Sequence, residues 1–220
     1  MPTTYQNEII IPVGDAKVQG MLTLPAASYG IVIFAHGSGS SRFSSRNQMV
    51  ARYLQQNHLG TLLFDLLTED EDEVYQNRFN IELLSRRLVM ATEWLEGVPE
   101  LTTPHIGYFG ASTGAAAALM AAAVLPRVQA VVSRGGRPDL AAPALPDVQS
   151  PTLLIVGGRD SEVLELNRSA QRQLKCENKL EIVVGATHLF EETGAMEKVC
   201  VLAASWFEQY LQPVKLERER

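Results

Sequence analysis

The chain has 220 residues, of which 46% are hydrophobic and 20% are charged, and its formal net charge at pH 7 is −6. This apolar fraction excludes an intrinsically disordered chain, and the 16 glycines and 11 prolines exclude collagen-like repetition. The acidic balance argues against nucleic acid as a partner, since such binding rests largely on a basic face. The length favours one large α/β domain spanning residues 1–220 over two domains.

The sequence also carries indications of the compartment. Its first eight residues include no basic or strongly apolar segment typical of a signal peptide. The most apolar stretch, 115–125, is about half the length that a membrane span requires, so no membrane is expected as a partner. Cys176 and Cys200 form no C-x-x-C motif and no metal-ligand spacing. We therefore expect a cytoplasmic protein with two free thiols, no metal, and Cys200 in its core.

Strand and helix patterns alternate along the chain. Two strands, 9–13 and 18–24, come first and are joined by a turn at Gly14-Asp15. Six nearly continuous apolar runs follow, and this pattern is typical of strands buried on both faces of a parallel sheet: 31–35, 61–64, 106–109, 128–132, 152–156 and 180–184. Helical patterns lie between and after these runs: 47–57, 81–96, 113–125, 162–174 and 195–211.

This alternation predicts a doubly wound, mostly parallel sheet of about eight strands with helices on both faces. No insertion is long enough to form a lid domain, and no linker or internal repeat interrupts the chain. The charged segment 215–220 has nothing to bury and is expected to be a solvated tail.

Ligands of such sheets bind outside the carboxyl ends of the strands, so the residues that follow each strand matter most. The third of the six apolar runs, 106–109, is followed by Gly110-Ala-Ser-Thr-Gly114 and then at once by a helix. This is a G-x-S-x-G motif in the strand–turn–helix setting of a nucleophile elbow. Its two glycines allow strand and helix to approach closely, and Ser112 is thereby predicted to be the nucleophile.

Two further strands end in residues that complete a catalytic triad. Asp160 follows the run 152–156, and His188 follows the run 180–184. The order Ser, Asp, His, with each residue beyond a separate strand, is that of the α/β-hydrolases. Asp139, beyond the run 128–132, is the one competing candidate for the acid.

The loop after the first of the six apolar runs, 31–35, is rich in glycine and serine: His36-Gly-Ser-Gly-Ser-Ser41. Backbone N–H groups in such a turn can stabilise an oxyanion, and we expect those of Ser38 and Thr113 to do so. His36 is expected to brace this loop. The alternative, a dinucleotide-binding loop, requires a third glycine where the chain has Arg42, and an acidic residue where it has Leu59-Gly-Thr.

Arginines follow the run 128–132 as well, in Ser133-Arg-Gly-Gly-Arg137. Arg134 and Arg137 could bind a substrate carboxylate through their guanidinium groups. The alternative, slightly favoured on sequence, is that both pair with the acidic run 69–73.

Taken together, these motifs resemble the α/β-hydrolase superfamily and, within it, the dienelactone hydrolase family. The resemblance extends from the His36 loop through the Ser112 elbow to the Asp160 and His188 turns. It implies an α/β-hydrolase fold and hydrolysis of an ester or lactone without a cofactor. Dienelactone hydrolases themselves carry a cysteine in the elbow, whereas this chain has Ser112, so the resemblance implies the fold and the triad but not the dienelactone substrate.

The sequence leaves several activities open on the same triad. The predicted function is a serine hydrolase of small esters or lactones, with a small molecule as its substrate. Peptidases, thioesterases and acyltransferases use the same arrangement, because loops outside the motifs shape the pocket. A non-catalytic binding protein is the remaining alternative, although such proteins commonly lose a member of the triad.

Overall fold

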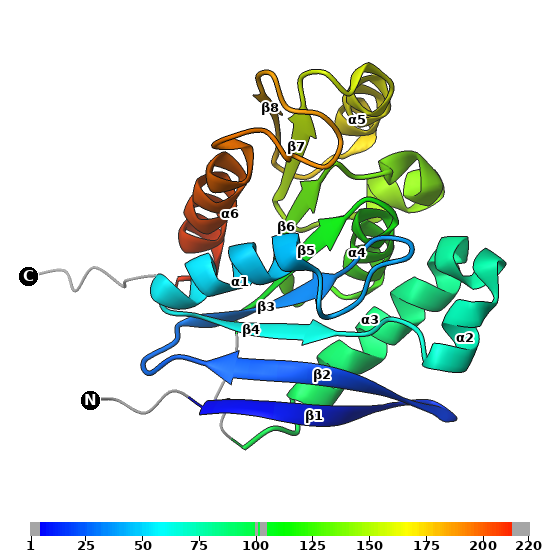
Figure 1. The fold of residues 1–220 in the computed structure, drawn as a ribbon, viewed down its shortest axis with the longest axis vertical. Helices are drawn as coiled ribbons and strands as arrows, with labels where there is room; N and C mark the ends of the chain where they lie inside the picture. Colours follow the sequence, from blue (N-terminus) through cyan, green and yellow to red (C-terminus); the bar gives the residue numbers. More distant parts are fainter. Residues whose placement is uncertain (1–4, 100, 102–104, 213–220) are drawn as a thin grey trace, which may run out of the picture.

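The computed structural model describes residues 5–99, 101 and 105–212 (Figure 1). A single eight-stranded sheet in the order β1-β2-β4-β3-β5-β6-β7-β8 forms its centre. The strands are β1 (Tyr5–Val13), β2 (Ala16–Leu24), β3 (Gly30–Ala35), β4 (Leu59–Phe64), β5 (His105–Ala111), β6 (Val128–Arg134), β7 (Thr152–Gly157) and β8 (Asn178–Val183).

The sheet is antiparallel at one edge and parallel elsewhere. β1 and β2 form a hairpin whose turn is Gly14-Asp15, as predicted, and Gly14 has the positive φ of 72° that favours glycine. β2 also pairs antiparallel with β4, and every pairing from β4 through β3 to β8 is parallel. The prediction of an eight-stranded, mostly parallel sheet is therefore confirmed.

Helices cover both faces of the sheet, which is also confirmed. The longer helices are α1 (Ser45–Gln56), α3 (Ile81–Leu95), α4 (Thr113–Val124), α5 (Ser161–Gln173) and α6 (Ala195–Leu211). Figure 1 shows α1 and α6 together on one side, where they share one core cluster, and α3, α4 and α5 contribute to a second cluster on the other side. Cys200 is buried in the first of these clusters, as expected. None of the described helices is long and apolar enough to span a bilayer.

The chain order places a topological switch point at β3. From β3 the chain continues to β4 on one side of it, and later returns to β5 on the other side. The loops after β3 and β5 lead to α1 and α4 on opposite faces of the sheet, and in open α/β sheets ligands bind at the carboxyl edge beside such a point. No lid covers this edge in the described part of the chain.

Some sequence expectations differ from the structure. The run 180–184 is not buried on both faces, because β8 is an edge strand that pairs only with β7; Ile182 is 39% exposed, and Val184 lies beyond the strand. Three short helical segments were not predicted: α2 (Glu69–Glu73), η1 (Tyr75–Phe79) and the proline-containing η2 (Pro138–Asp147). The expected tail at 215–220 lies outside the described residues.

Candidate active site

Ser112 occupies a sharp turn between β5 and α4. Its φ and ψ are 52° and −121°, a conformation that non-glycine residues rarely adopt. Two backbone hydrogen bonds fix the turn: the N–H of Ser112 donates to the carbonyl of Arg134 at 3.2 Å, and the N–H of Arg137 donates to the carbonyl of Ser112 at 3.1 Å. The end of β6 thus holds the elbow that carries Ser112.

The two motif glycines allow the close approach that this turn requires. A Cβ on Gly110 would lie 2.4 Å from the Cα of Ala115, and one on Gly114 would lie 2.2 Å from the carbonyl oxygen of Ala35. Both contacts are with backbone, which cannot move aside as a side chain can. The elbow therefore excludes any side chain at these two positions.

His188 and Asp160 meet beside this turn. Their Nδ1 and Oδ2 atoms lie 2.6 Å apart, and because an ionised carboxylate only accepts hydrogen bonds, Nδ1 is the donor. The neutral ring then carries its lone pair on Nε2. The Asp160 side chain is 14% exposed and that of His188 39%, so the acid lies behind the ring while the ring reaches the surface of the site.

Asp139 does not occupy the place of the acid. Its carboxylate accepts two hydrogen bonds from Arg137, at 2.9 and 2.7 Å. Of the two carboxylates considered from the sequence, only Asp160 is hydrogen-bonded to His188.

Ser112 and His188 line the same cavity, which has a volume of about 150 Å³. Its other lining residues come from the β3–α1 loop, the first turn of α1, the ends of β5 and β6, and the β8–α6 loop: Gly37, Ser38, Ser40, Ser44, Arg46, Asn47, Ala111, Arg134 and Leu189. In the described part of the chain, no three His, Cys, Asp or Glu side chains are grouped as metal ligands.

The loop after β3 passes directly over the elbow. A Cβ on Gly37 would lie 3.2 Å from the Cβ of Ser112, so Ser38 follows at the edge of the cavity. Thr113 borders a smaller adjoining cavity of about 10 Å³, which Ser38 also lines. As the first residue of α4, Thr113 has a backbone N–H without a partner in the helix. The two expected oxyanion donors therefore lie close to each other.

His36 holds this loop in place through two hydrogen bonds. Its Nδ1 donates to the carbonyl of Gly37 at 3.0 Å, and its Nε2 accepts from the backbone N–H of Leu66 at 3.0 Å. The second contact requires an unprotonated Nε2 and hence the neutral ring, and burial lowers the pKa of His36 below its ordinary value. The ring thereby connects the ends of β3 and β4.

The two arginines after β6 have different surroundings. Arg134 is buried and lines the cavity beside Ser112. Arg137 does not line it, because its guanidinium pairs with Asp139 on η2. Substrate binding by the two arginines stays a prediction, with Arg134 in the lining of the cavity and Arg137 outside it.

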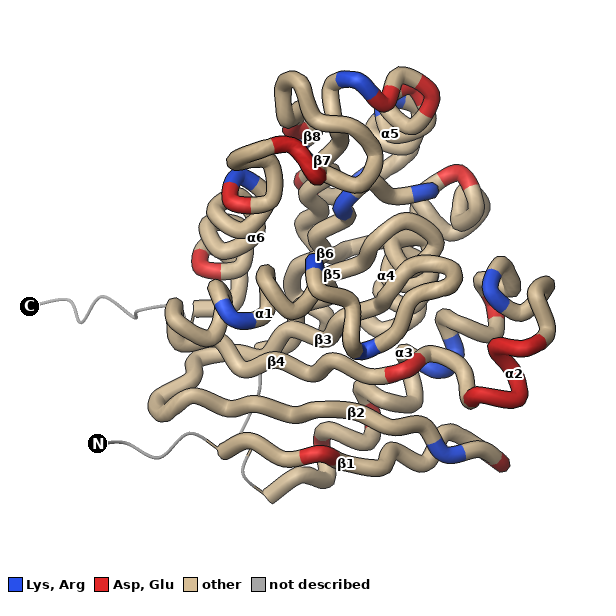
Figure 2. The backbone as a smooth tube through the Cα atoms, viewed as in Figure 1, with Lys and Arg blue, Asp and Glu red and all other residues tan. Residues whose placement is uncertain are grey.

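The acidic run 69–73 is not the partner of either arginine. Figure 2 shows it as a red stretch on α2, at the margin of the molecule. Asp72 pairs with Arg78 at 2.8 Å, and Glu71 pairs with Arg87. The ion pairing favoured on sequence is wrong: Arg137 pairs with Asp139, and among the described residues no ion pair joins Arg134 to this run.

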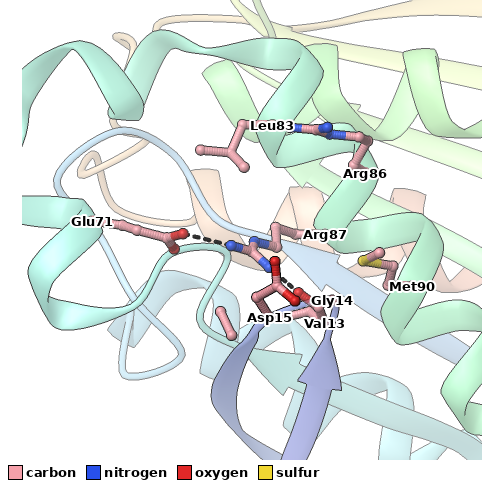
Figure 3. A pocket seen from close by; sticks show the side chains of 9 residues that line it. Val13, Gly14, Asp15, Glu71, Leu83, Arg86, Arg87 and Met90 are labelled. Atoms are coloured by element: carbon pink, nitrogen blue, oxygen red, sulfur yellow. Dashed lines mark hydrogen bonds and ion pairs between the residues drawn. The ribbon is translucent and has the colours of Figure 1, made fainter.

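A larger cavity of about 410 Å³ lies elsewhere, between α2, α3 and the β1–β2 turn (Figure 3). Arg87 extends across it and donates to the carbonyl of Val13 and to Glu71. Among the residues that the structure describes, no serine, cysteine or histidine lines this cavity. We interpret its polar contacts as structural links between α3, α2 and the hairpin.

The sequence reasoning missed Arg46 and Asn47, which line the cavity from the first turn of α1. The available signal was their position directly after the glycine-rich loop, at the start of a helix whose N-terminus faces the carboxyl edge. Because polar residues are common in the first turn of any helix, their types alone did not indicate a site.

The fold and the arrangement at the carboxyl edge define an α/β hydrolase. The sequence matches the Dienelactone hydrolase family over residues 20–211, and the chain belongs to this family. The crystal structure of a dienelactone hydrolase from Anabaena variabilis superposes on this chain with a TM-score of 0.92, and the two sequences are 52% identical. The match covers 95% of this chain and 99% of that one. Est1E from Butyrivibrio proteoclasticus has the same fold at 15% identity, with a TM-score of 0.79 over 92% and 98% of the two chains.

Two sequence relatives come from strains of Mycobacterium tuberculosis, and each is named "Putative phosphoribosyl transferase". Both are 54% identical to this chain over 212 residues, which is 96% of its length. The chain spans only 48% of the length of either relative.

Proposed function

We propose that this protein is a serine hydrolase that cleaves a small ester or lactone through an acyl-enzyme intermediate. The observation that carries the proposal is the 2.6 Å hydrogen bond from His188 to Asp160, beside a cavity that Ser112 also lines. Membership of a hydrolase family supports the reaction class. The choice of an ester bond is our own inference.

In the proposed mechanism, the Ser112 Oγ attacks the carbonyl carbon of the substrate while Nε2 of His188 accepts its proton. Asp160 stabilises the resulting imidazolium through Nδ1. The backbone N–H groups of Ser38 and Thr113 donate to the oxyanion of the tetrahedral intermediate. As this intermediate collapses, the C–O bond breaks and His188 returns the proton to the leaving alcohol; a water molecule activated by His188 then hydrolyses the acyl-enzyme.

The size and openness of the site support a small substrate. A cavity of about 150 Å³ has room for several water molecules, and hence for a short acyl chain and not a long lipid chain. The name of the Mycobacterium relatives describes another reaction, but those proteins are much longer than this chain. We therefore propose hydrolysis, and not phosphoribosyl transfer, for the part that this chain shares with them.

Turnover of p-nitrophenyl esters, thioesters, lactones and aminoacyl amides by the wild type and the Ser112→Ala variant tests this proposal. We expect the fastest turnover with short esters, and a loss of several orders of magnitude in kcat in the variant. Ser40→Ala is the matched control, since Ser40 lines the same cavity without being the expected nucleophile.

A fluorophosphonate probe should label Ser112 in the wild type and label nothing in the Ser112→Ala variant. Labelling at another residue, or unchanged hydrolysis in that variant, contradicts the proposed nucleophile. Preferential turnover of thioesters or amides would instead identify one of the other reactions of this triad.

A further inference from the structure

β8 forms one edge of the sheet, and its outer side has no partner strand among the described residues. It is the last strand in the sheet order and pairs in unbroken parallel register with β7 from Asn178 to Val183. Figure 1 shows β8 and β1 at opposite ends of the sheet. An edge strand presents a row of free backbone N–H and C=O groups, and another strand can pair with them.

The two edges of the sheet differ in how well they are protected from such pairing. β1 exposes Ile10, but it also contains Pro12, which has no N–H, and an exposed polar run, 6–8. β8 contains neither proline nor glycine. The apolar side chains of Ile182 and, just beyond the strand, of Val184 are 39% and 91% exposed. Of the two edges, β8 is therefore the more open to another strand.

The direction of the backbone groups determines which residues of β8 are available for pairing. The carbonyls of Glu177 and Val183 accept hydrogen bonds from the N–H groups of Thr152 and Gly158, each at 2.9 Å. Because backbone groups alternate in direction along a strand, the odd-numbered residues of β8 bond with β7. The N–H and C=O groups of its even-numbered residues therefore point outward.

The side chains of β8 also separate into two faces. Leu180 packs against the core cluster on the α5 side, and Val183 belongs to the cluster on the α6 side. Alternation places Ile182 on the face of Leu180, and Lys179 and Glu181 on the face of Val183. On that second face, Nζ of Lys179 lies 2.6 Å from Oε1 of Glu181. One face of the edge is thus apolar, and the other carries one cation and one anion.

We propose that β8 pairs antiparallel with β8 of a second copy of this chain, about a two-fold axis at Leu180. In this register the outward backbone groups of Leu180 bond to those of the partner's Leu180, and a continuous sheet runs through both copies. Lys179 then lies opposite the partner's Glu181, and Glu181 lies opposite the partner's Lys179. These are non-hydrogen-bonded positions, where facing side chains are closest.

Charge complementarity is the reason for choosing a second copy as the occupant. An axis at Lys179 or at Glu181 would place two like charges directly opposite each other, which is destabilising. The axis at Leu180 instead gives two attractive pairs on one face. On the other face it brings Leu180 against the partner's Leu180, with Ile182 of each copy beside them. A two-fold interface requires a surface that is complementary to itself in this way.

A protective role is the alternative for Lys179, because a lysine on an edge strand commonly prevents pairing with another sheet. In that role its charge repels an approaching strand, and its removal promotes association. In the proposed dimer its charge attracts the partner's Glu181, and its removal weakens association. The two roles thus predict changes of opposite sign.

Sedimentation equilibrium of the 220-residue chain, at a series of protein concentrations, measures the dimer directly. Lys179→Glu and Glu181→Lys should each raise the dissociation constant by about tenfold or more, because each turns two attractive cross-strand pairs into repulsive ones. The variant with both changes places opposite charges face to face again, and its dissociation constant should lie within about threefold of the wild-type value. Glu8→Lys, the same charge change on the edge strand β1, is the control and should have an effect within about twofold.

A cysteine at the axis tests the register. Two residues that face each other in a hydrogen-bonded antiparallel pair have Cα atoms about 5.5 Å apart, a distance that a disulfide spans. Leu180→Cys, in a Cys176→Ser background that leaves only the buried Cys200, should therefore form a disulfide-linked dimer under mild oxidation. Lys179→Cys in the same background should form little, because it faces the partner's Glu181. The opposite result contradicts the axis at Leu180.

Ile182→Pro removes an outward N–H without breaking a hydrogen bond to β7, and it should abolish the dimer. Thermal unfolding establishes that each variant is folded, and the charge series decides alone if Ile182→Pro does not fold. A wild type that stays monomeric up to its limit of solubility overturns the proposal, as does a dimer that neither single charge change weakens. None of these measurements uses turnover, so they are independent of the proposed hydrolysis.

Discussion

Nδ1 of His188 and Oδ2 of Asp160 lie 2.6 Å apart, although 28 residues separate them in the chain. Adjacent parallel strands account for this contact, since β7 and β8 pair in register and both end at the same edge. Gly157 permits the two following loops to touch: a Cβ there would lie 2.5 Å from the carbonyl oxygens of Ala186 and Thr187. The pairing of the two side chains thus follows from strand order and from one position that excludes a side chain.

Replacing Asp160 by Asn tests the role of this hydrogen bond. The amide no longer favours the tautomer with its proton on Nδ1 and no longer stabilises an imidazolium, so kcat for a neutral ester should fall by about 10⁴-fold. Asp139→Asn is the control, because it removes only the partly exposed pair with Arg137 and should change kcat by less than threefold. A larger loss in the control than in Asp160→Asn would identify Asp139 as the acid.

The elbow glycines predict a severe effect on stability. Gly114→Ala introduces a methyl group 2.2 Å from a backbone oxygen of β3, so strand and helix must separate. We expect a loss of about 3 kcal/mol or more in the free energy of unfolding, measured by urea denaturation.

Gly97→Ala provides the comparison for this substitution. The nearest atom to a Cβ at Gly97 is 3.5 Å away, an ordinary contact, and the change should leave the free energy of unfolding within about 0.5 kcal/mol. Similar stabilities of the two variants would contradict the packing argument.

Much of the fold and of the candidate site follows from local signals. Apolar runs separated by helical periods define the sheet, and the G-x-S-x-G motif falls at the one junction where β5 meets α4. The positions of Asp160 and His188 after their strands then bring them to a common edge. These features are predictable because strand ends and glycine turns are encoded within a few residues.

The features that the sequence did not reveal depend on contacts between distant segments. The exposure of β8 is a consequence of its edge position, which its apolar composition does not disclose. Arg134 and Arg137 have the same residue type and lie on the same loop, yet Arg137 pairs with an aspartate of η2 while Arg134 is buried beside Ser112. Such differences are determined by the direction of each side chain, and spacing alone does not specify it.

The ion pair between Glu71 and Arg87 predicts a local effect on stability at the cavity in Figure 3. Glu71→Gln leaves the largely buried guanidinium of Arg87 with its contact to Val13 but without a charged partner. The free energy of unfolding should fall by about 1.5–3 kcal/mol, the range for hydrogen bonds to charged groups. Glu73→Gln, an exposed change on the same helix, should have an effect within about 0.5 kcal/mol. Equal changes in the free energy of unfolding for the two substitutions would show that the ion pair between Glu71 and Arg87 stabilises the fold no more than a surface charge does.

The burial of His36 predicts a dependence of stability on pH. Its folded-state pKa lies below the ordinary value of 6.5, chiefly because burial disfavours the charged ring, and Nε2 must stay unprotonated to accept from Leu66. Below about pH 6.5 the ring of His36 binds a proton in the unfolded chain but not in the folded protein. The stabilisation that comes from the neutral ring is therefore present above that pH, and it is lost as the pH falls towards the lowered pKa. The wild type should therefore lose up to about 1.4 kcal/mol per pH unit more than His36→Gln, whose side chain does not titrate.

Urea denaturation at pH 7, 6 and 5 measures this slope. His58→Asn is the control, because His58 is exposed and has a φ of 60°, which asparagine tolerates. This substitution should leave the slope of the wild type unchanged. Parallel curves for wild type and His36→Gln would mean that the ring is not held neutral by its surroundings, and that another group causes any loss of stability in acid.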